Sequence, residues 1–172
     1  GFLLSTPIEL AIMTGNLING GKAIRPNIIK SLPDNTKVAE SSIKYNNFKI
    51  EHLNIIKEAM FNVVNTRKGT AWKSRSHDKD YSISGKTGTS QVRIISALER
   101  ASGIIKNKDL PLNKRDHALF IGFAPFNKPR YITSVVLEHA GGGSTNAAPI
   151  GRDLLIASRK IIEGIDTKII VS

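Results

Sequence analysis

The chain of 172 residues contains no cysteine. This absence excludes disulfide bridges, thiol catalysis and cysteine-based zinc sites, although it leaves the cellular compartment open. The apolar run Phe2-Leu3-Leu4 is too short for the hydrophobic region of a signal peptide or for a membrane span. Because the chain begins at Gly1 rather than at methionine, we expect it to be a fragment cut from a longer protein.

Aromatic and acidic residues are both scarce. Aromatic residues make up 6% of the chain, and 14 acidic residues stand against 25 basic ones, which leaves a net charge of +11. Such a charge is typical of proteins that bind nucleic acids or anionic membranes. The lysines are scattered through loop-like stretches, however, with few aromatic residues between them for base stacking. We therefore expect no nucleic-acid binding and interpret the basic residues as a solvated surface.

Three segments carry the signals of helices. Residues 6–9 read Thr-Pro-Ile-Glu, which is an N-cap, a proline at the first helical position and a capping-box glutamate, and they predict a helix to about Ile18. Gly20-Gly21 then stops this helix. Apolar residues recur at helical spacing between residues 53 and 64, before the basic, glycine-terminated end at 67–69. A last helix is expected over residues 147–162.

Extended segments dominate the second half of the chain. We predict strands over residues 81–89, 118–124 and 131–138. The turn residues at 126–130 indicate that the last two strands form an antiparallel hairpin. A long insertion at 91–115 separates the first two strands, and its amphipathic part at 94–105 favours a short helix. The predicted fold class is α+β, with one domain built from an antiparallel sheet flanked by helices.

The most informative motif is the Ser-Gly-Lys-Thr-Gly-Thr run at residues 84–89. A lysine followed by Thr-Gly on a strand is one of three signature motifs of the serine acyltransferases that penicillin inhibits. An ammonium group at Lys86 on a strand beside a cleft can attract a substrate carboxylate and assist proton transfer from a serine. The motif therefore indicates acyl transfer on a peptide that carries a carboxylate.

The residues after the lysine fit the same chemistry. Because Gly88 has no side chain, an extended peptide can lie against the strand, while the hydroxyls of Thr87 and Thr89 can bind a carboxylate. The amide of Thr89 can donate to an oxyanion, and such a donor contributes about 3 to 4 kcal/mol to transition-state stabilisation. A solvent-facing strand end that has no function remains the alternative for so short a motif.

The other two signature motifs have no convincing copy upstream of this strand. Residues 41–44 form a Ser-x-x-Lys, but they lie in a polar stretch, and 15 serines and 16 lysines make one chance copy expected. Residues 144–146 form a Ser-x-Asn on the wrong side of the strand, where Ser144 is better interpreted as a turn or N-cap residue. The four histidines lack ligand spacing, so we predict no metal site and no cofactor; His117 is interpreted as a packing or surface residue.

Several ordered blocks of the sequence resemble the penicillin-binding proteins, specifically the C-terminal part of the transpeptidase domain of class B enzymes of the penicillin-binding protein 2 kind. The blocks are residues 1–11, Asn19-Gly20-Gly21-Lys22, Arg25-Pro26, Met60 with Val63-Val64-Asn65, Gly69-Thr70-Ala71, residues 86–92, residues 116–125, Gly141-Gly142-Gly143 and Ala147-Ala148-Pro149-Ile150. Together they cover nearly the whole chain.

This resemblance implies a D,D-transpeptidase that cross-links peptidoglycan through a serine acyl-enzyme and binds β-lactams. Carried over, Lys86 is the third-motif lysine, Thr87 and Thr89 contact the substrate carboxylate, and Gly88 leaves room for the stem peptide. Residues 1–172 would then be the C-terminal portion of the domain, inactive alone because the nucleophile lies in an absent N-terminal half. The implied partners are stem peptides, β-lactams and cell-wall elongation proteins, and the implied location is a membrane-anchored parent at the periplasmic face of the bacterial inner membrane.

Two other hypotheses remain open. One is a fragment of a serine β-lactamase or carboxypeptidase, which shares the Lys-Thr-Gly chemistry but not the contexts Gly69-Thr70-Ala71 and Phe123-Ala124-Pro125. The other is a non-catalytic basic interaction module, whose binding to polyanions would depend on salt. Since a missing nucleophile helix would leave an apolar face uncovered, we also expect the isolated chain to self-associate.

Overall fold

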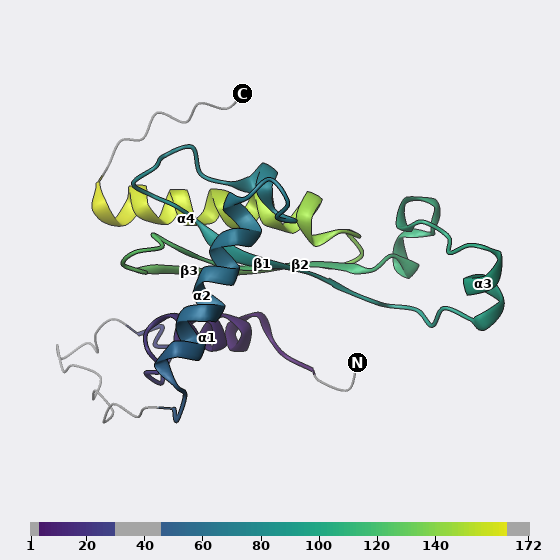
Figure 1. Cartoon of the computed structure of the whole chain (residues 1–172). Helices are drawn as coiled ribbons and strands as arrows, with labels where there is room; N and C mark the ends of the chain where they lie inside the picture. The colour runs from purple at the N-terminus through teal and green to yellow at the C-terminus, as the bar shows by residue number, and fades with distance from the viewer. Residues whose placement is uncertain (1–3, 30–45, 165–172) are drawn as a thin grey trace.

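A computed structural model describes residues 4–29 and 46–164 and shows one three-stranded antiparallel sheet in the order β1-β2-β3. Helix α4 covers one face of the sheet and α1 the other, while α2 crosses in front (Figure 1). This arrangement confirms the predicted α+β class. The elements are α1 (Pro7–Ile18), α2 (Ile50–Asn65), β1 (Ser84–Ser90), α3 (Ala97–Ser102), β2 (His117–Ala124), β3 (Tyr131–Leu137) and α4 (Ala148–Glu163), with short helical turns η1 (Trp72–Ser74), η2 (Asn107–Asp109), η3 (Leu112–Lys114) and η4 (Gly143–Ala147).

The capping signals of α1 are confirmed. The backbone amide of Thr6 donates to the Glu9 carboxylate at 2.7 Å, and the amide of Glu9 donates to the Thr6 hydroxyl, so the capping box is complete. Gly20 and Gly21 have φ angles of 80° and 84°, the left-handed conformation that ends a helix. Residues 24–29 form no helix and pair with no described strand.

Helix α2 buries Leu53, Met60 and Val64 at the predicted spacing. Its end differs in mechanism from the expected glycine cap, because Gly69 does not adopt a positive φ. A Cβ at Gly69 would lie 2.2 Å from the carbonyl oxygen of Val63, so glycine is needed here to let the chain fold back onto the last helical turn. The amide of Ala71 then donates to that same carbonyl at 3.0 Å.

The three predicted strands are present, and β2 and β3 form the predicted antiparallel hairpin. The first strand begins at Ser84 rather than at residue 81. Tyr81 lies in a turn, and its buried hydroxyl donates to the carbonyl of Leu155 at 2.8 Å, which ties this turn to α4. The insertion at 91–115 projects away from the body and contains α3, which is shorter than the predicted 94–105 (Figure 1).

The face of the sheet under α4 is built around one phenylalanine. Thr87, Phe120 and Val135 lie opposite one another on this face, and Phe120 is almost fully buried. Glycines border its ring, since a Cβ at Gly85, at Gly122 or at Gly151 of α4 would lie within 2.4, 2.6 and 2.3 Å of ring atoms respectively. The helix and the sheet therefore approach closely just beneath the Lys-Thr-Gly strand.

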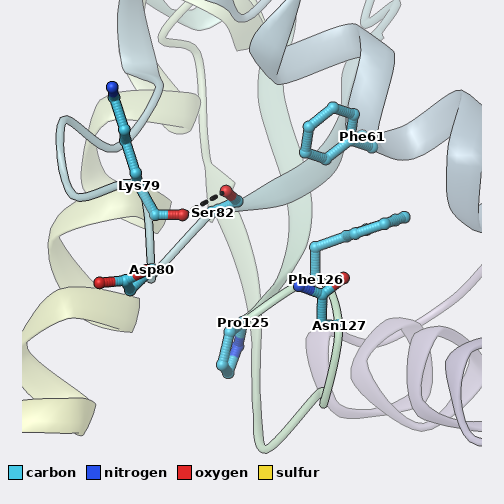
Figure 2. Close-up of a pocket in the computed structure, with 7 residues that line it drawn as sticks. All are labelled: Phe61, Lys79, Asp80, Ser82, Pro125, Phe126 and Asn127. Atoms are coloured by element: carbon cyan, nitrogen blue, oxygen red, sulfur yellow. Dashed lines mark hydrogen bonds between the residues drawn. The ribbon is translucent and has the colours of Figure 1, made fainter.

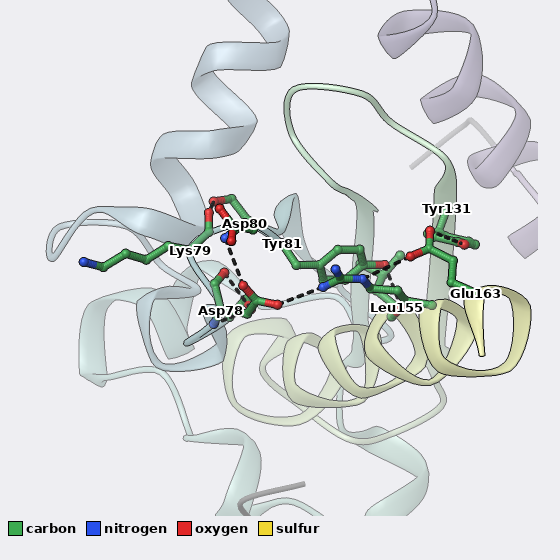
Figure 3. Close-up of polar contacts among 10 residues, drawn as sticks. Asp78, Lys79, Asp80, Tyr81, Tyr131, Leu155 and Glu163 are labelled. Atoms are coloured by element: carbon green, nitrogen blue, oxygen red, sulfur yellow. Dashed lines mark hydrogen bonds and ion pairs between the residues drawn. The ribbon is translucent and has the colours of Figure 1, made fainter. Parts of the chain in front are cut away.

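Polar contacts attach the C-terminal end of α4 to the neighbouring elements (Figure 3). The Arg159 guanidinium lies between Asp78 at 2.8 Å and Glu163 at 3.2 Å, and Glu163 also accepts from the hydroxyl of Tyr131 at 2.9 Å. The bond from Tyr131, with the nearby guanidinium groups, lowers the pKa of Glu163 below its ordinary value of 4.5. This network joins α4, β3 and the turn before β1. In the parts of the chain that the structure describes, no helix is both long and apolar enough to cross a membrane.

Candidate active site

Strand β1, which carries the Lys-Thr-Gly motif, lies at the edge of the sheet. Its backbone groups alternate in direction. The Ser82 carbonyl accepts from the amide of Phe126 on the β2 side, whereas the Ile83 carbonyl accepts from the Asn65 side chain at 2.8 Å on the other side. Because this alternation continues along a regular antiparallel strand, the backbone groups of Thr87 and Thr89 point away from β2. An extended peptide can therefore add to this edge.

Lys86 is exposed and lies opposite Ile121, on the sheet face away from α4. Its ammonium group donates to the carbonyl oxygen of Thr87 at 2.7 Å. This contact keeps a positive charge along the free edge of β1, beside the backbone that would meet a peptide. The location agrees with the predicted role, which remains a prediction.

Gly88 is crowded on one face and open on the other. On the α4 face, a Cβ at Gly143 would lie 2.2 Å from the Gly88 carbonyl oxygen and 2.4 Å from that of Leu119, so η4 rests directly on the strand backbone. On the opposite face, a Cβ at Gly88 would meet only the Leu119 side chain, at 3.3 Å. The Gly141-Gly142-Gly143 run therefore does more than turn the chain, because Gly143 is needed for the close contact.

The side chains of Thr87 and Thr89 lie on the face of β1 opposite Lys86 and Gly88, as the alternation of a strand requires. The Thr89 side chain is exposed. The Thr87 hydroxyl lies 2.8 Å from the hydroxyl of Thr70, a residue of the turn after α2. The sequence pattern signalled Thr70 only as part of a similar block, without indicating that it contacts the motif.

Of the two nucleophile motifs that the sequence analysis rejects, the Ser-x-x-Lys at residues 41–44 lies outside the described residues. Ser144 lies inside the helical turn η4, whose N-cap is Gly142. Of the two interpretations of Ser144, the turn residue is therefore confirmed and the N-cap is wrong. The sequence contains a further Ser-x-x-Lys, Ser76 to Lys79, which was not considered as a candidate. This segment forms a turn in which the Asp78 amide donates to the Ser76 hydroxyl. A serine in a turn does not face a lysine one helical turn away.

A cavity of about 290 Å³ lies at the start of β1 and not at the motif (Figure 2). Phe61 and Phe126 form one wall, with their ring centroids 4.7 Å apart, and Lys79 and Ser82 lie on the other side. Lys86 is not among the lining residues. The motif itself lies on the edge strand of the described sheet.

Two of the four histidines, His117 and His139, pack against each other. The Nδ1 atom of His117 accepts from the amide of His139 at 2.9 Å, and the two rings meet edge to face with centroids 4.7 Å apart. This confirms His117 as a half-buried packing residue. Among residues 4–29 and 46–164, no cluster of three or more histidine, aspartate or glutamate side chains could hold a metal ion.

The known proteins to which this chain is similar include peptidoglycan D,D-transpeptidases. Residues 1–156 match the family described as the penicillin binding protein transpeptidase domain. The peptidoglycan D,D-transpeptidase MrdA of Haemophilus influenzae is 35% identical over 159 residues, which cover 90% of this chain and 24% of that protein. The chain thus spans about a quarter of the length of the curated relatives it matches.

Solved structures agree with this match. The penicillin-binding protein 2 (PBP2) of Pseudomonas aeruginosa, solved with the compound WCK 5153, superposes with a TM-score of 0.72 at 32% identity, over 92% of this chain and 31% of that one. The PBP2 of Helicobacter pylori, solved in complex with MreC, has a TM-score of 0.66 at 28% identity, over 95% of this chain and 26% of that one. On this evidence the chain belongs to the penicillin-binding protein transpeptidase family.

Proposed function

We propose that residues 1–172 are the C-terminal portion of the transpeptidase domain of a PBP2-type D,D-transpeptidase, which cross-links peptidoglycan stem peptides through a serine acyl-enzyme. The observation that carries this proposal is the open edge of β1, where the ammonium of Lys86 lies against the Thr87 carbonyl and the backbone of Thr89 points outward. The family match and the likeness to MrdA support the chemistry.

In this proposal the serine lies outside the chain. Its oxygen attacks the carbonyl carbon between the two terminal D-alanines of a stem peptide, and its proton passes to the leaving D-alanine amine as that bond breaks. An amine of a second stem then attacks the ester, which forms the cross-link and frees the serine. This chain supplies the groups that bind the substrate carboxylate. Lys86 attracts the terminal carboxylate and assists the proton transfer, while the hydroxyls of Thr87 and Thr89 bind that carboxylate.

Gly88 has a separate part in the proposal. Only the Leu119 side chain lies close to the open face of Gly88. The donor stem can therefore lie along β1 and form hydrogen bonds to its free edge. The Thr89 amide serves as an oxyanion donor. β-Lactams, whose ring amide and carboxylate resemble the stem terminus, would acylate the same serine. The isolated chain is inactive because it lacks that serine.

The wider setting follows from the relatives. MrdA is by name a peptidoglycan transpeptidase, and the Helicobacter pylori PBP2 has been solved with MreC, so we propose elongation proteins as partners of the whole protein. Its site of action would be the periplasmic face of the inner membrane, to which another part of the protein anchors it. Exposed apolar residues such as Ile8 of α1 and Ile55 of α2 support the expectation that the isolated chain self-associates. A monodisperse monomer in light scattering at high concentration would contradict it.

Labelling with a fluorescent penicillin tests the proposal. The full-length protein, its Lys86→Ala and Lys79→Ala variants and the isolated chain are incubated with the reagent and separated by denaturing electrophoresis. We expect label on the full-length protein, a loss of more than about tenfold in labelling rate for Lys86→Ala, a normal rate for Lys79→Ala and no label on the isolated chain. Labelling of the isolated chain would show a nucleophile within it, with Ser41 as the first suspect; no label on any form would favour a non-catalytic module.

A further inference from the structure

Thr70 contacts the Lys-Thr-Gly motif from outside β1. Its hydroxyl oxygen lies 2.8 Å from that of Thr87, although 17 positions separate the two residues in sequence. We propose that Thr70 is a positioning residue, which orients the Thr87 hydroxyl so that its hydrogen points at the carboxylate of the substrate. This inference rests on the proposed function, in which Thr87 binds that carboxylate.

The backbone around Thr70 is held from both sides. The amide of Gly69 donates to the Thr66 carbonyl at 2.9 Å, and the amide of Ala71 donates to the Val63 carbonyl at 3.0 Å. Ala71 is 1% exposed and belongs to the hydrophobic core, so the turn is anchored as well as hydrogen-bonded. The hydroxyl of Thr70 is thus presented to β1 from a fixed support, whereas the Thr70 side chain itself remains exposed to solvent.

The hydrogens of the two hydroxyls decide what the pair can bind. Each hydroxyl carries one hydrogen, and in the contact of 2.8 Å either oxygen can be the donor. If Thr87 donates to Thr70, it presents only lone pairs to an incoming carboxylate. If Thr70 donates to Thr87, the hydrogen of Thr87 is free to donate to the carboxylate. The bond from Thr70 to Thr87 and the bond from Thr87 to the carboxylate then form a chain, in which each strengthens the other. An anionic ligand therefore selects the second arrangement, in which the bond donated by Thr70 fixes the direction of the Thr87 hydrogen.

The chain offers a matched control at Thr66. This threonine lies at the end of the same helix, and its hydroxyl donates to the carbonyl of Asn62 at 2.7 Å without contacting β1. A Thr66→Val substitution removes a hydroxyl bond of similar length near the same turn. It separates a general effect on the helix end from an effect on Thr87.

The experiment measures the second-order rate of acylation of the full-length protein by a β-lactam that bears its ring carboxylate and by the neutral methyl ester of the same compound. For Thr70→Val and Thr70→Ala we expect the carboxylate compound to react about tenfold more slowly, equivalent to about 1.4 kcal/mol, and the ester rate to change less than about twofold. Thr70→Ser is expected to restore the rate, and Thr66→Val to leave both rates unchanged. Thr70→Ala is included because the extra methyl group of valine can lower the melting temperature. We expect the alanine variant to show the same selective slowing of the carboxylate compound.

Two results would overturn the inference while the proposed function stands. The first is a wild-type rate for the carboxylate compound in both Thr70→Val and Thr70→Ala, which would show that Thr87 needs no partner. The second is an equal slowing of acid and ester, which would show a purely structural role for the turn. Failure of the wild-type protein to react with either compound would instead refute the proposed function itself.

Discussion

Substituting Gly151 by alanine probes the close contact between α4 and the sheet beneath the motif. The new methyl group would lie 2.3 Å from Cδ1 and 2.7 Å from Cε1 of Phe120. Its ring cannot withdraw toward the sheet, because there it already rests on the backbone of Gly85 and Gly122. Either the ring or the helix must move.

The magnitude follows from two opposing effects. Overpacking of a well-packed core costs about 1 to 3 kcal/mol, while replacing glycine by alanine in a helix recovers up to about 1 kcal/mol. With the full gain of about 1 kcal/mol from alanine, we expect Gly151→Ala to lower the free energy of unfolding by up to about 2 kcal/mol. Urea unfolding can be followed by the fluorescence of Trp72, the only tryptophan of the chain, whose ring lies 3.9 Å from the guanidinium carbon of Arg75.

A second substitution tests the cause. Phe120→Leu removes ring atoms that meet the new methyl, so the double variant should be more stable than the sum of the two single effects predicts, by at least about 1 kcal/mol. Additive effects would refute the argument, since they would show that the Gly151 methyl and the Phe120 ring do not meet. A Gly151→Ala protein more stable than the wild type would refute it equally.

Two further predictions concern η4, which precedes α4, and the C-terminal end of α4. Gly143→Ala should reduce both stability and the penicillin-labelling rate of the full-length protein, because its Cβ would strike the Gly88 and Leu119 carbonyls; Gly142→Ala should be tolerated, since its Cβ would meet only the movable Thr145 hydroxyl at 3.1 Å. Equal effects of the two alanines on labelling would contradict this. At the other end, the lowered pKa of Glu163 means that its stabilising effect is complete above the unfolded-state value of about 4.5 and is lost as pH falls through the folded-state pKa. Urea unfolding from pH 7 to pH 3 should therefore show a smaller loss of stability for Glu163→Gln than for the wild type, and parallel curves would refute the assignment.

Local signals were sufficient for much of the fold. The Thr6 and Glu9 capping box, the apolar spacing of α2 and the turn between β2 and β3 act over four or five neighbouring residues, so the pattern predicts these elements without knowledge of the rest of the chain. Their boundaries were less secure. Residues 81–83 have the composition of a strand, yet Tyr81 is hydrogen-bonded to Leu155 of α4, and β1 begins only at Ser84.

The sequence by itself determined the residue types at the site: the lysine, threonines and glycine at 86–89 and the ordered blocks that identify the family. Only the tertiary structure decided that β1 is an edge strand, that Thr70 meets Thr87, and that glycines from β1, β2 and α4 border one ring. The physical reason is distance along the chain. The contacts of Thr70 with Thr87 and of Phe120 with Gly85 and Gly151 join residues 17 to 35 positions apart. Such pairs leave no periodicity or spacing in a single sequence because they form only when separate elements pack together.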